Sequence, residues 1–112
     1  MKRLYASCLT ATMLLAPLGA YADGYVMGAG QWTCAEVVRV YDSGTGIEKG
    51  QVFGWIMGYW SSATFHRETK FIDTVEKFGG LGISEATVAR CRKASPETLL
   101  HKLTDDIIRN TK

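Results

Sequence analysis

Cysteine positions constrain this chain more than any other feature of its sequence. The 112 residues contain three cysteines, at positions 8, 34 and 91. Cys8 lies in a segment that we expect to be removed on export, and Tyr5 stands where a lipoprotein motif has an aliphatic residue. Removal leaves Cys34 and Cys91, an even pair for which one disulfide is expected in an oxidising compartment. By loop entropy this bond would contribute roughly 4 kcal/mol, comparable to the net stability of a small domain.

The first 22 residues have the pattern of a secretory signal peptide. A short basic start, Met1–Arg3, precedes an apolar and small-residue run, Leu4–Gly19. Ala20-Tyr21-Ala22 then has the small-x-small form of a signal-peptidase site. We therefore expect residues 1–22 to be a cleaved signal peptide and residues 23–112 to form one small exported helical domain.

The charge balance argues against two classes of partner. Removing Lys2 and Arg3 with the signal lowers the sum of Lys and Arg from 13 to 11, which equals the number of Asp and Glu. A neutral chain lacks the clustered basic excess that nucleic acids or anionic membranes require. No second apolar run is long enough to span a membrane. Below pH 3 the formal charge would rise to about +14, a self-repulsion that permits acid loosening without proving it.

Hydrophobic spacing and capping signals predict the first helices. Thr33 and Glu36 have the spacing of a capping box, so a helix should begin there, with Cys34 on its apolar face. It should end in the turn at residues 42–46. The apolar run over about 48–66 favours a second helix by its length and its four-residue spacing. The glycine-containing segment Asp23–Gln31 is expected to be a mobile leader.

Three shorter helices are expected after residue 66. The first carries Phe71, Val75 and Phe78 and closes at Gly79-Gly80. The second is capped by Ser84 and carries Cys91, and the third begins at Ser95-Pro96-Glu97. The predicted fold is therefore all-α, a small single-domain bundle of about four to five helices with one disulfide.

The predicted helix over 48–66 combines glycine with aromatic residues. Its glycines recur every four residues, a spacing that predicts a helix-packing stripe made of Gly50, Gly54 and Gly58. Aromatic residues are too frequent in this chain for a small core to bury them all, so part of the aromatic surface is expected to bind a partner or client. On this helix the candidate binding residues are Phe53, Trp55, Tyr59 and Trp60.

A search for catalytic or metal-binding patterns finds none. His101 and Asp105 are spaced to pair on a helix surface, which is a structural contact more often than a catalytic one. His66 and His101 lack metal-ligand spacing with the two cysteines. No phosphate loop and no Gly-x-Ser-x-Gly element is present. We therefore predict no catalytic residue, no metal and no cofactor, and a protein that is not an enzyme.

Several motifs together resemble a known family. Trp32-Thr33-Cys34-Ala35-Glu36 after a signal peptide, Gly58-Tyr59 within a helix, and Cys91 followed by Pro96 and an amphipathic helix are similar to the HdeA/HdeB family of periplasmic acid-stress chaperones. The segment from Pro96 to Asp106 also resembles YmgD-type periplasmic proteins. The resemblance covers most of residues 23–112. It implies a small all-helical domain with one disulfide, a homodimer near neutral pH and no enzymatic activity.

The same resemblance implies a function. In the best-known members of the family, acid loosens the dimer and exposes apolar surface that holds unfolding periplasmic proteins. We therefore expect a periplasmic holdase that exposes apolar surface at low pH. Two rivals remain open: an exported inhibitor or immunity-type protein, and an envelope assembly factor. Either of them would bind one fixed protein partner rather than many clients.

Overall fold

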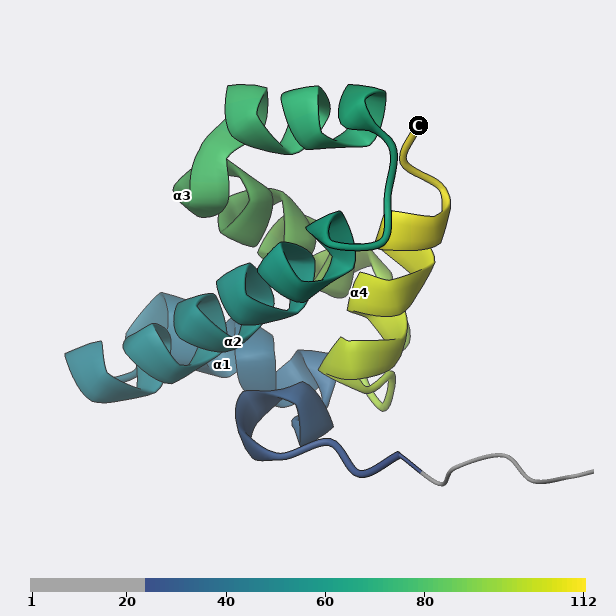
Figure 1. The fold of residues 1–112 in the computed structure, drawn as a ribbon. Helices are drawn as coiled ribbons and strands as arrows, with labels where there is room; N and C mark the ends of the chain where they lie inside the picture. The colour runs from purple at the N-terminus through teal and green to yellow at the C-terminus, as the bar shows by residue number, and fades with distance from the viewer. Residues whose placement is uncertain (1–23) are drawn as a thin grey trace, which may run out of the picture.

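The computed structural model describes residues 24–112. The predicted signal peptide, residues 1–22, lies outside the described residues, and so does Cys8. The described chain forms an all-α fold, as predicted, with no strand among residues 24–112 (Figure 1). Its elements, in order, are the 3-10 helix η1 (Gly28–Gln31) and the α-helices α1 (Cys34–Ser43), α2 (Gly46–Thr64), α3 (Thr69–Lys93) and α4 (Leu100–Arg109).

Capping boxes fix the starts of the first two α-helices. Thr33 Oγ1 accepts from the Glu36 amide at 3.2 Å, and the Glu36 carboxylate accepts from the Thr33 amide at 3.3 Å, which confirms the predicted start of α1. Thr45 and Glu48 form a second, unpredicted box, with distances of 3.1 and 3.0 Å. Because this box satisfies the first amides of α2, that helix begins at Gly46, slightly earlier than expected.

Helix α3 is bent at Gly79. The φ of Gly79 is 71° and its ψ is 164°, a conformation that glycine adopts at little cost. The bend divides α3 into a first arm, residues 69–78, and a second arm, residues 80–93, which diverge in Figure 1. The predicted break is confirmed, but the predicted cap at Ser84 is wrong. The second arm resumes directly after Gly79, so Ser84 is fully buried within it and donates to the Gly80 carbonyl at 2.8 Å.

The predicted helix start at Ser95-Pro96-Glu97 is also wrong, because α4 begins only at Leu100. The carbonyl groups of this segment have partners in another helix. The Cys34 amide donates to the Thr98 carbonyl at 2.7 Å, and the Ala35 amide donates to the Pro96 carbonyl at 3.1 Å. Residues 95–99 therefore satisfy the free amides at the start of α1 and form a turn instead of a helix, in which the Thr98 amide donates to the Ser95 carbonyl at 3.0 Å.

The disulfide between Cys34 and Cys91 is confirmed. It joins α1 to the second arm of α3, with a Cα–Cα distance of 4.9 Å. Both cysteines are buried in the core, and α2 contacts all of the other elements. The largest fully buried side chains of the core are Phe71, Ile56, Leu100, Val37, Val40, Val52 and Val88.

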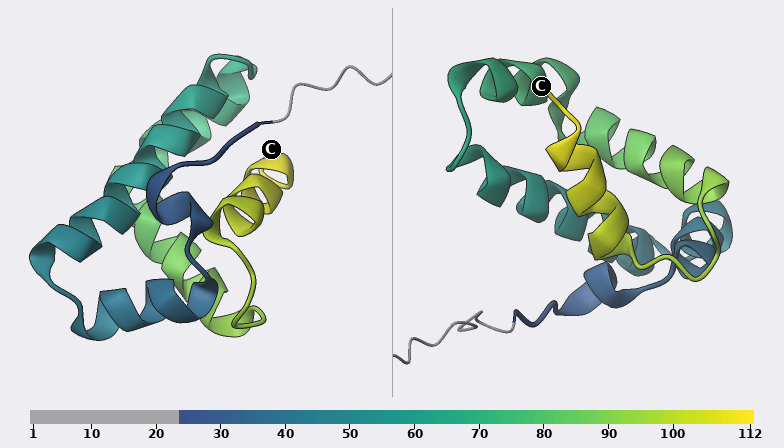
Figure 2. Two further views of the ribbon diagram at one scale, coloured as in Figure 1. Left: turned by 90° about the horizontal axis from the view of Figure 1, so that it is seen from below. Right: turned by 90° about the vertical axis from the view of Figure 1, so that its right-hand side faces the viewer.

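The predicted mobile leader, Asp23–Gln31, is wrong for its second half, because residues 28–31 are folded; residues 24–27 have no regular structure, and Asp23 lies outside the described residues. Residues 28–31 form η1, which packs against α2 and α4, as Figure 2 shows. Ala29 and Gly30 are buried there, and the Trp55 indole lies where a side chain at Gly30 would be. A large aromatic residue of α2 thus holds η1 in place, because the glycine lets it approach the backbone closely.

Candidate functional site

The four predicted aromatic binding residues do not share one surface. Phe53 is half-buried and packs beside Tyr41 of α1, with ring centroids 6.1 Å apart. Trp55 stacks on Tyr59, with centroids 5.0 Å apart. Trp60 is only 5% exposed, so its assignment to a binding surface was wrong for this conformation. The four residues lie at different angles around α2, so their side chains contact different elements. The helix is apolar on several faces because several elements surround it.

Tyr59 links α2 to α4 through a carboxylate. Its hydroxyl donates to Asp105 Oδ1 at 3.3 Å, and Arg109 Nε donates to Asp105 Oδ2 at 2.9 Å. Burial raises the pKa of the Tyr59 phenol, and the nearby negative charge of Asp105 raises it further. In the described chain Asp105 therefore binds Tyr59 and Arg109 rather than His101, the partner that the sequence suggested.

The predicted glycine stripe is not an internal packing surface. Gly50, Gly54 and Gly58 lie on the exposed side of α2, and a Cβ at each would meet no atom of the described chain within 4 Å. The prediction is therefore wrong for contacts within the chain. Contact with a second copy is a separate prediction.

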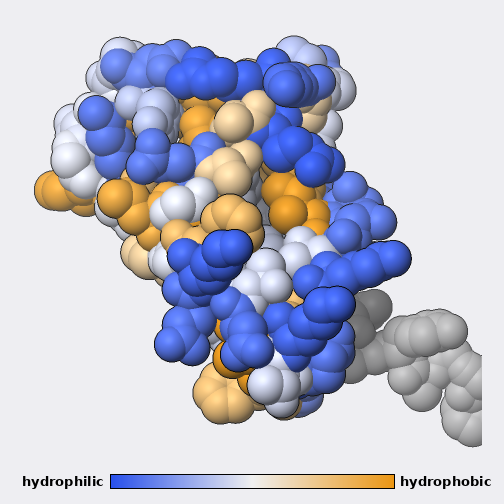
Figure 3. Space-filling view, turned by 90° about the horizontal axis from the view of Figure 1, so that it is seen from above, coloured by the Kyte–Doolittle hydropathy of each residue, from blue (hydrophilic) through white to orange (hydrophobic). Residues whose placement is uncertain are grey.

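Exposed apolar side chains gather instead at the bend of α3. Phe78 is 63% exposed and Leu81 is 60% exposed, one on each side of Gly79-Gly80. Met57 of α2 is 40% exposed and packs at Gly80, where a side chain would collide with its thioether. We call Met57, Phe78 and Leu81 the bend surface. Figure 3 shows apolar surface between hydrophilic side chains on the face that carries the first arm.

The sequence contained a signal for this surface that our sequence analysis missed. Phe78 and Leu81 are large apolar residues in the run Phe78-Gly79-Gly80-Leu81-Gly82. Glycine has no side chain with which to cover a neighbour, and a bend directs adjacent residues outward. Large apolar residues interleaved with glycines at a helix break are therefore candidates for exposure.

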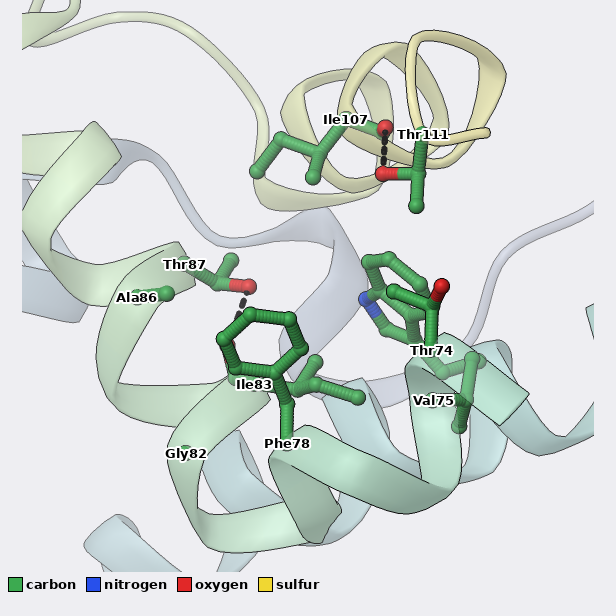
Figure 4. A pocket seen from close by; sticks show the side chains of 10 residues that line it. Thr74, Val75, Phe78, Gly82, Ile83, Ala86, Thr87, Ile107 and Thr111 are labelled. Atoms are coloured by element: carbon green, nitrogen blue, oxygen red, sulfur yellow. Dashed lines mark hydrogen bonds between the residues drawn. The ribbon is translucent and has the colours of Figure 1, made fainter. Parts of the chain in front are cut away.

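A pocket of about 150 Å³ opens beside the bend, between the two arms of α3 and α4. Figure 4 shows Phe78 and Ile83 on one side of this space and Ile107 and Thr111 on the other. A second pocket of about 150 Å³ shares part of this wall and reaches Met57. No charged side chain lines either pocket. The first is lined by Trp60, Thr74, Val75, Phe78, Gly82, Ile83, Ala86, Thr87, Ile107 and Thr111.

The first arm of α3 is held mainly at its beginning. Phe71 is fully buried and stacks on Trp60, and the Arg67 guanidinium lies 3.9 Å from the centre of the Phe71 ring. Arg67 also donates to the carbonyls of Ile108 at 3.2 Å and Thr111 at 2.9 Å. The end of the arm has no comparable anchor in the described residues, since it leads directly to Gly79 and the exposed Phe78. The bend surface therefore lies at the less restrained end of the arm.

The described residues offer apolar contact area rather than a constellation for metal binding. Between residues 24 and 112, no group of three or more His, Cys, Asp and Glu side chains is placed to hold a metal ion. Within the same range, no helix has the length and apolar character needed to cross a membrane. No protein-family model, curated protein or solved structure matches the chain.

Proposed function

We propose that this protein is a periplasmic holdase that binds apolar segments of unfolding proteins at the bend surface. The observation that carries the proposal is the exposure of Met57, Phe78 and Leu81 around the bend at Gly79-Gly80. Side chains of this kind are expected at surfaces that bind other proteins. The proposed holdase activity and periplasmic location are taken from the resemblance to the HdeA/HdeB family. The same resemblance suggests a homodimer, in which a second copy of the chain would cover the bend surface near neutral pH.

Acid would uncover this surface by weakening the contacts between helices. Asp42 of α1 accepts from Arg92 of the second arm at 3.1 Å, and Asp106 of α4 lies 3.7 Å from Arg90 of the same arm. Protonation of Asp42 or Asp106 removes one of these attractions. Each of these ion pairs is exposed, so each contributes little to the stability of the fold by itself. Their loss acts together with the large positive charge of the acidified chain, which repels itself.

The disulfide would limit how far the acidified chain opens. Cys34 and Cys91 tie α1 to the second arm of α3 at any pH, because a disulfide does not titrate. The first arm, residues 69–78, lies inside the loop that the bond closes, whereas α4 follows Cys91 and lies outside it. Acid opening would therefore let α4 separate and the inside of the loop loosen, while α1 and the second arm stay tethered, so that the chain could close again on neutralisation.

The test is an aggregation assay with the purified, disulfide-bonded protein and an unrelated client at pH 2 to 3 and at pH 7. We expect protection at the acidic pH and a shift from dimer to monomer. The double variant Phe78→Ser/Leu81→Ser should lose protection. A matched control, Ile47→Ser/Phe65→Ser, removes two exposed apolar side chains that lie away from the bend and should retain protection.

Two outcomes would contradict the proposal. If the protein stays compact at pH 2 and does not slow client aggregation, the proposal of acid chaperone activity is disproved. If both double variants protect equally well, the bend surface is not where clients bind. Recovery of one stoichiometric partner at neutral pH, without acid protection, would favour the fixed-partner classes.

A further inference from the structure

The chain covers part of α2 and α4 with its own residues 24–31, which we call the N-terminal segment. In the left view of Figure 2 this segment runs between the two helices, and η1 contacts both. Only Ala29 and Gly30 of the segment are buried. Among residues 24–112, no hydrogen bond or ion pair joins the segment to α2 or α4. The segment is therefore held in place by apolar contacts alone.

These contacts centre on the indole of Trp55 in α2. A Cβ on Gly30 would collide with the six-membered ring of Trp55, and a Cβ on Gly28 would lie 3.8 Å from its Cδ1. The backbone of the segment thus lies against both rings of the indole. Trp55 also stacks on Tyr59, with centroids 5.0 Å apart. The segment therefore covers one member of an aromatic pair with glycine backbone rather than with a large side chain.

We propose that the N-terminal segment is a displaceable cover, and that the surface of α2 and α4 beneath it binds a matching segment of another polypeptide. The cover itself shows which chemistry this surface accepts. Val26 packs beside Gly30, and no charged side chain occurs between residues 24 and 35. The partner is therefore an uncharged segment in which an aliphatic residue is followed, four positions later, by glycine.

The cover can open without unfolding the helices. Segments that bury few apolar side chains open at a low cost in free energy. Trp32 would stay in place, because its carbonyl accepts from the Leu100 amide at 2.8 Å, so the segment can lift away from Gln31 onward. Opening uncovers Trp55 beside Tyr59, two residues that the sequence analysis assigned to a binding surface. The inference does not depend on chaperone activity, because it concerns the folded protein at neutral pH.

A synthetic peptide with the sequence of residues 24–32 tests the proposal, with the purified, disulfide-bonded protein at pH 7. Ala29→Asp places a carboxylate in the buried contact and should hold the cover open. Met27→Asp is the matched control, since Met27 is 74% exposed and the same charge there should leave the cover closed. In calorimetric titration the peptide should bind Ala29→Asp about tenfold or more tightly than it binds Met27→Asp or the unmodified protein, because a closed protein must open before it binds.

The indole signal of Trp55 in ¹H–¹⁵N spectra gives a second readout. This signal, identified by its loss in Trp55→Phe, should move in Ala29→Asp and return toward its original position when the peptide is added. A peptide that carries Gly30→Val should bind about tenfold more weakly, because the new side chain collides with Trp55. If Ala29→Asp does not fold, Gly30→Ala opens the cover through the same collision and replaces it.

Three results would overturn the proposal. The first is equal affinity of the peptide for Ala29→Asp and Met27→Asp, or no binding to either, which would mean that the segment covers no binding surface. The second is a Trp55 signal that does not respond to the peptide, which would place the peptide elsewhere. The third is equal binding of the Gly30→Val peptide, which would mean that the surface accepts any apolar segment rather than a matching one.

Discussion

Phe71 lies flat against Trp60, with ring planes 5° apart and centroids separated by 5.7 Å. The two residues come from α3 and α2, and both are buried. This stack is the main apolar contact that holds the first arm of α3 against the rest of the fold. The stability of the arm should therefore depend on one aromatic pair rather than on a continuous helical face.

The first prediction is that Phe71→Ala destabilises the protein by about 3 to 5 kcal/mol, the usual cost of removing a buried aromatic ring. The loss should appear in denaturant unfolding, and amide exchange should accelerate most over residues 69–78. Phe78→Ala is the matched control, because that ring is 63% exposed and its loss should cost far less. Equal losses for the two variants would contradict the described burial.

The second prediction concerns the Cys34–Cys91 bond. Non-reduced mass spectrometry of periplasmic protein should find one linked peptide pair and no free thiol at either position. The double variant Cys34→Ala/Cys91→Ala should be less stable by roughly 4 kcal/mol, because the unfolded chain regains the freedom of a long loop. Reduction of the unmodified protein should lower its stability similarly. Two free thiols in periplasmic material would disprove the bond.

The third prediction separates glycines that have space from glycines that do not. Gly54→Ala and Gly58→Ala should each stabilise the chain by up to about 1 kcal/mol, because alanine favours helix and the space beside both is open. Gly30→Ala should instead destabilise it by about 1 to 3 kcal/mol, since the new methyl group collides with Trp55. Thermal unfolding of the three variants measures both effects. Gly54→Leu, followed by solution mass, then tests whether the stripe contacts a second copy.

Local signals in the sequence predicted the parts of the fold that depend on neighbouring residues. Thr33 and Glu36 form their capping box because the hydrogen bonds close within one helical turn. Gly79 breaks α3 because its backbone conformation favours glycine. The Cys34–Cys91 pairing followed from counting alone, since removal of the predicted signal peptide would leave only two cysteines.

Contacts between distant segments explain what the sequence did not predict. Ser95-Pro96-Glu97 has good helix-start chemistry, yet the carbonyl of Pro96 accepts from the Ala35 amide of α1 and the segment forms only a turn. Ser84 is a residue type that often caps a helix, yet it caps none here because the second arm of α3 begins before it, directly after Gly79. Trp60 is buried because the first arm folds back over it, which a linear pattern cannot show. The bend surface is a different case, because the glycines beside Phe78 and Leu81 were a local signal that the sequence analysis overlooked.

The fourth prediction is a pH dependence at the contact between α1 and α3. The hydrogen bonds that Arg92 donates hold the pKa of Asp42 below its ordinary value of 3.8. A carboxylate with a lowered pKa in the folded state adds stability above its unfolded pKa, and this stability is lost as the pH falls through the folded value. Asp42→Asn should therefore have a lower melting temperature than the unmodified protein at pH 6, and the difference should shrink below about pH 3.8.

Asp73→Asn is the control, because Asp73 is exposed and has no ion pair among residues 24–112, so its effect should be small at both pH values. A melting-temperature difference for Asp42→Asn that persists unchanged at pH 2 would mean that the variant acts through packing rather than through charge.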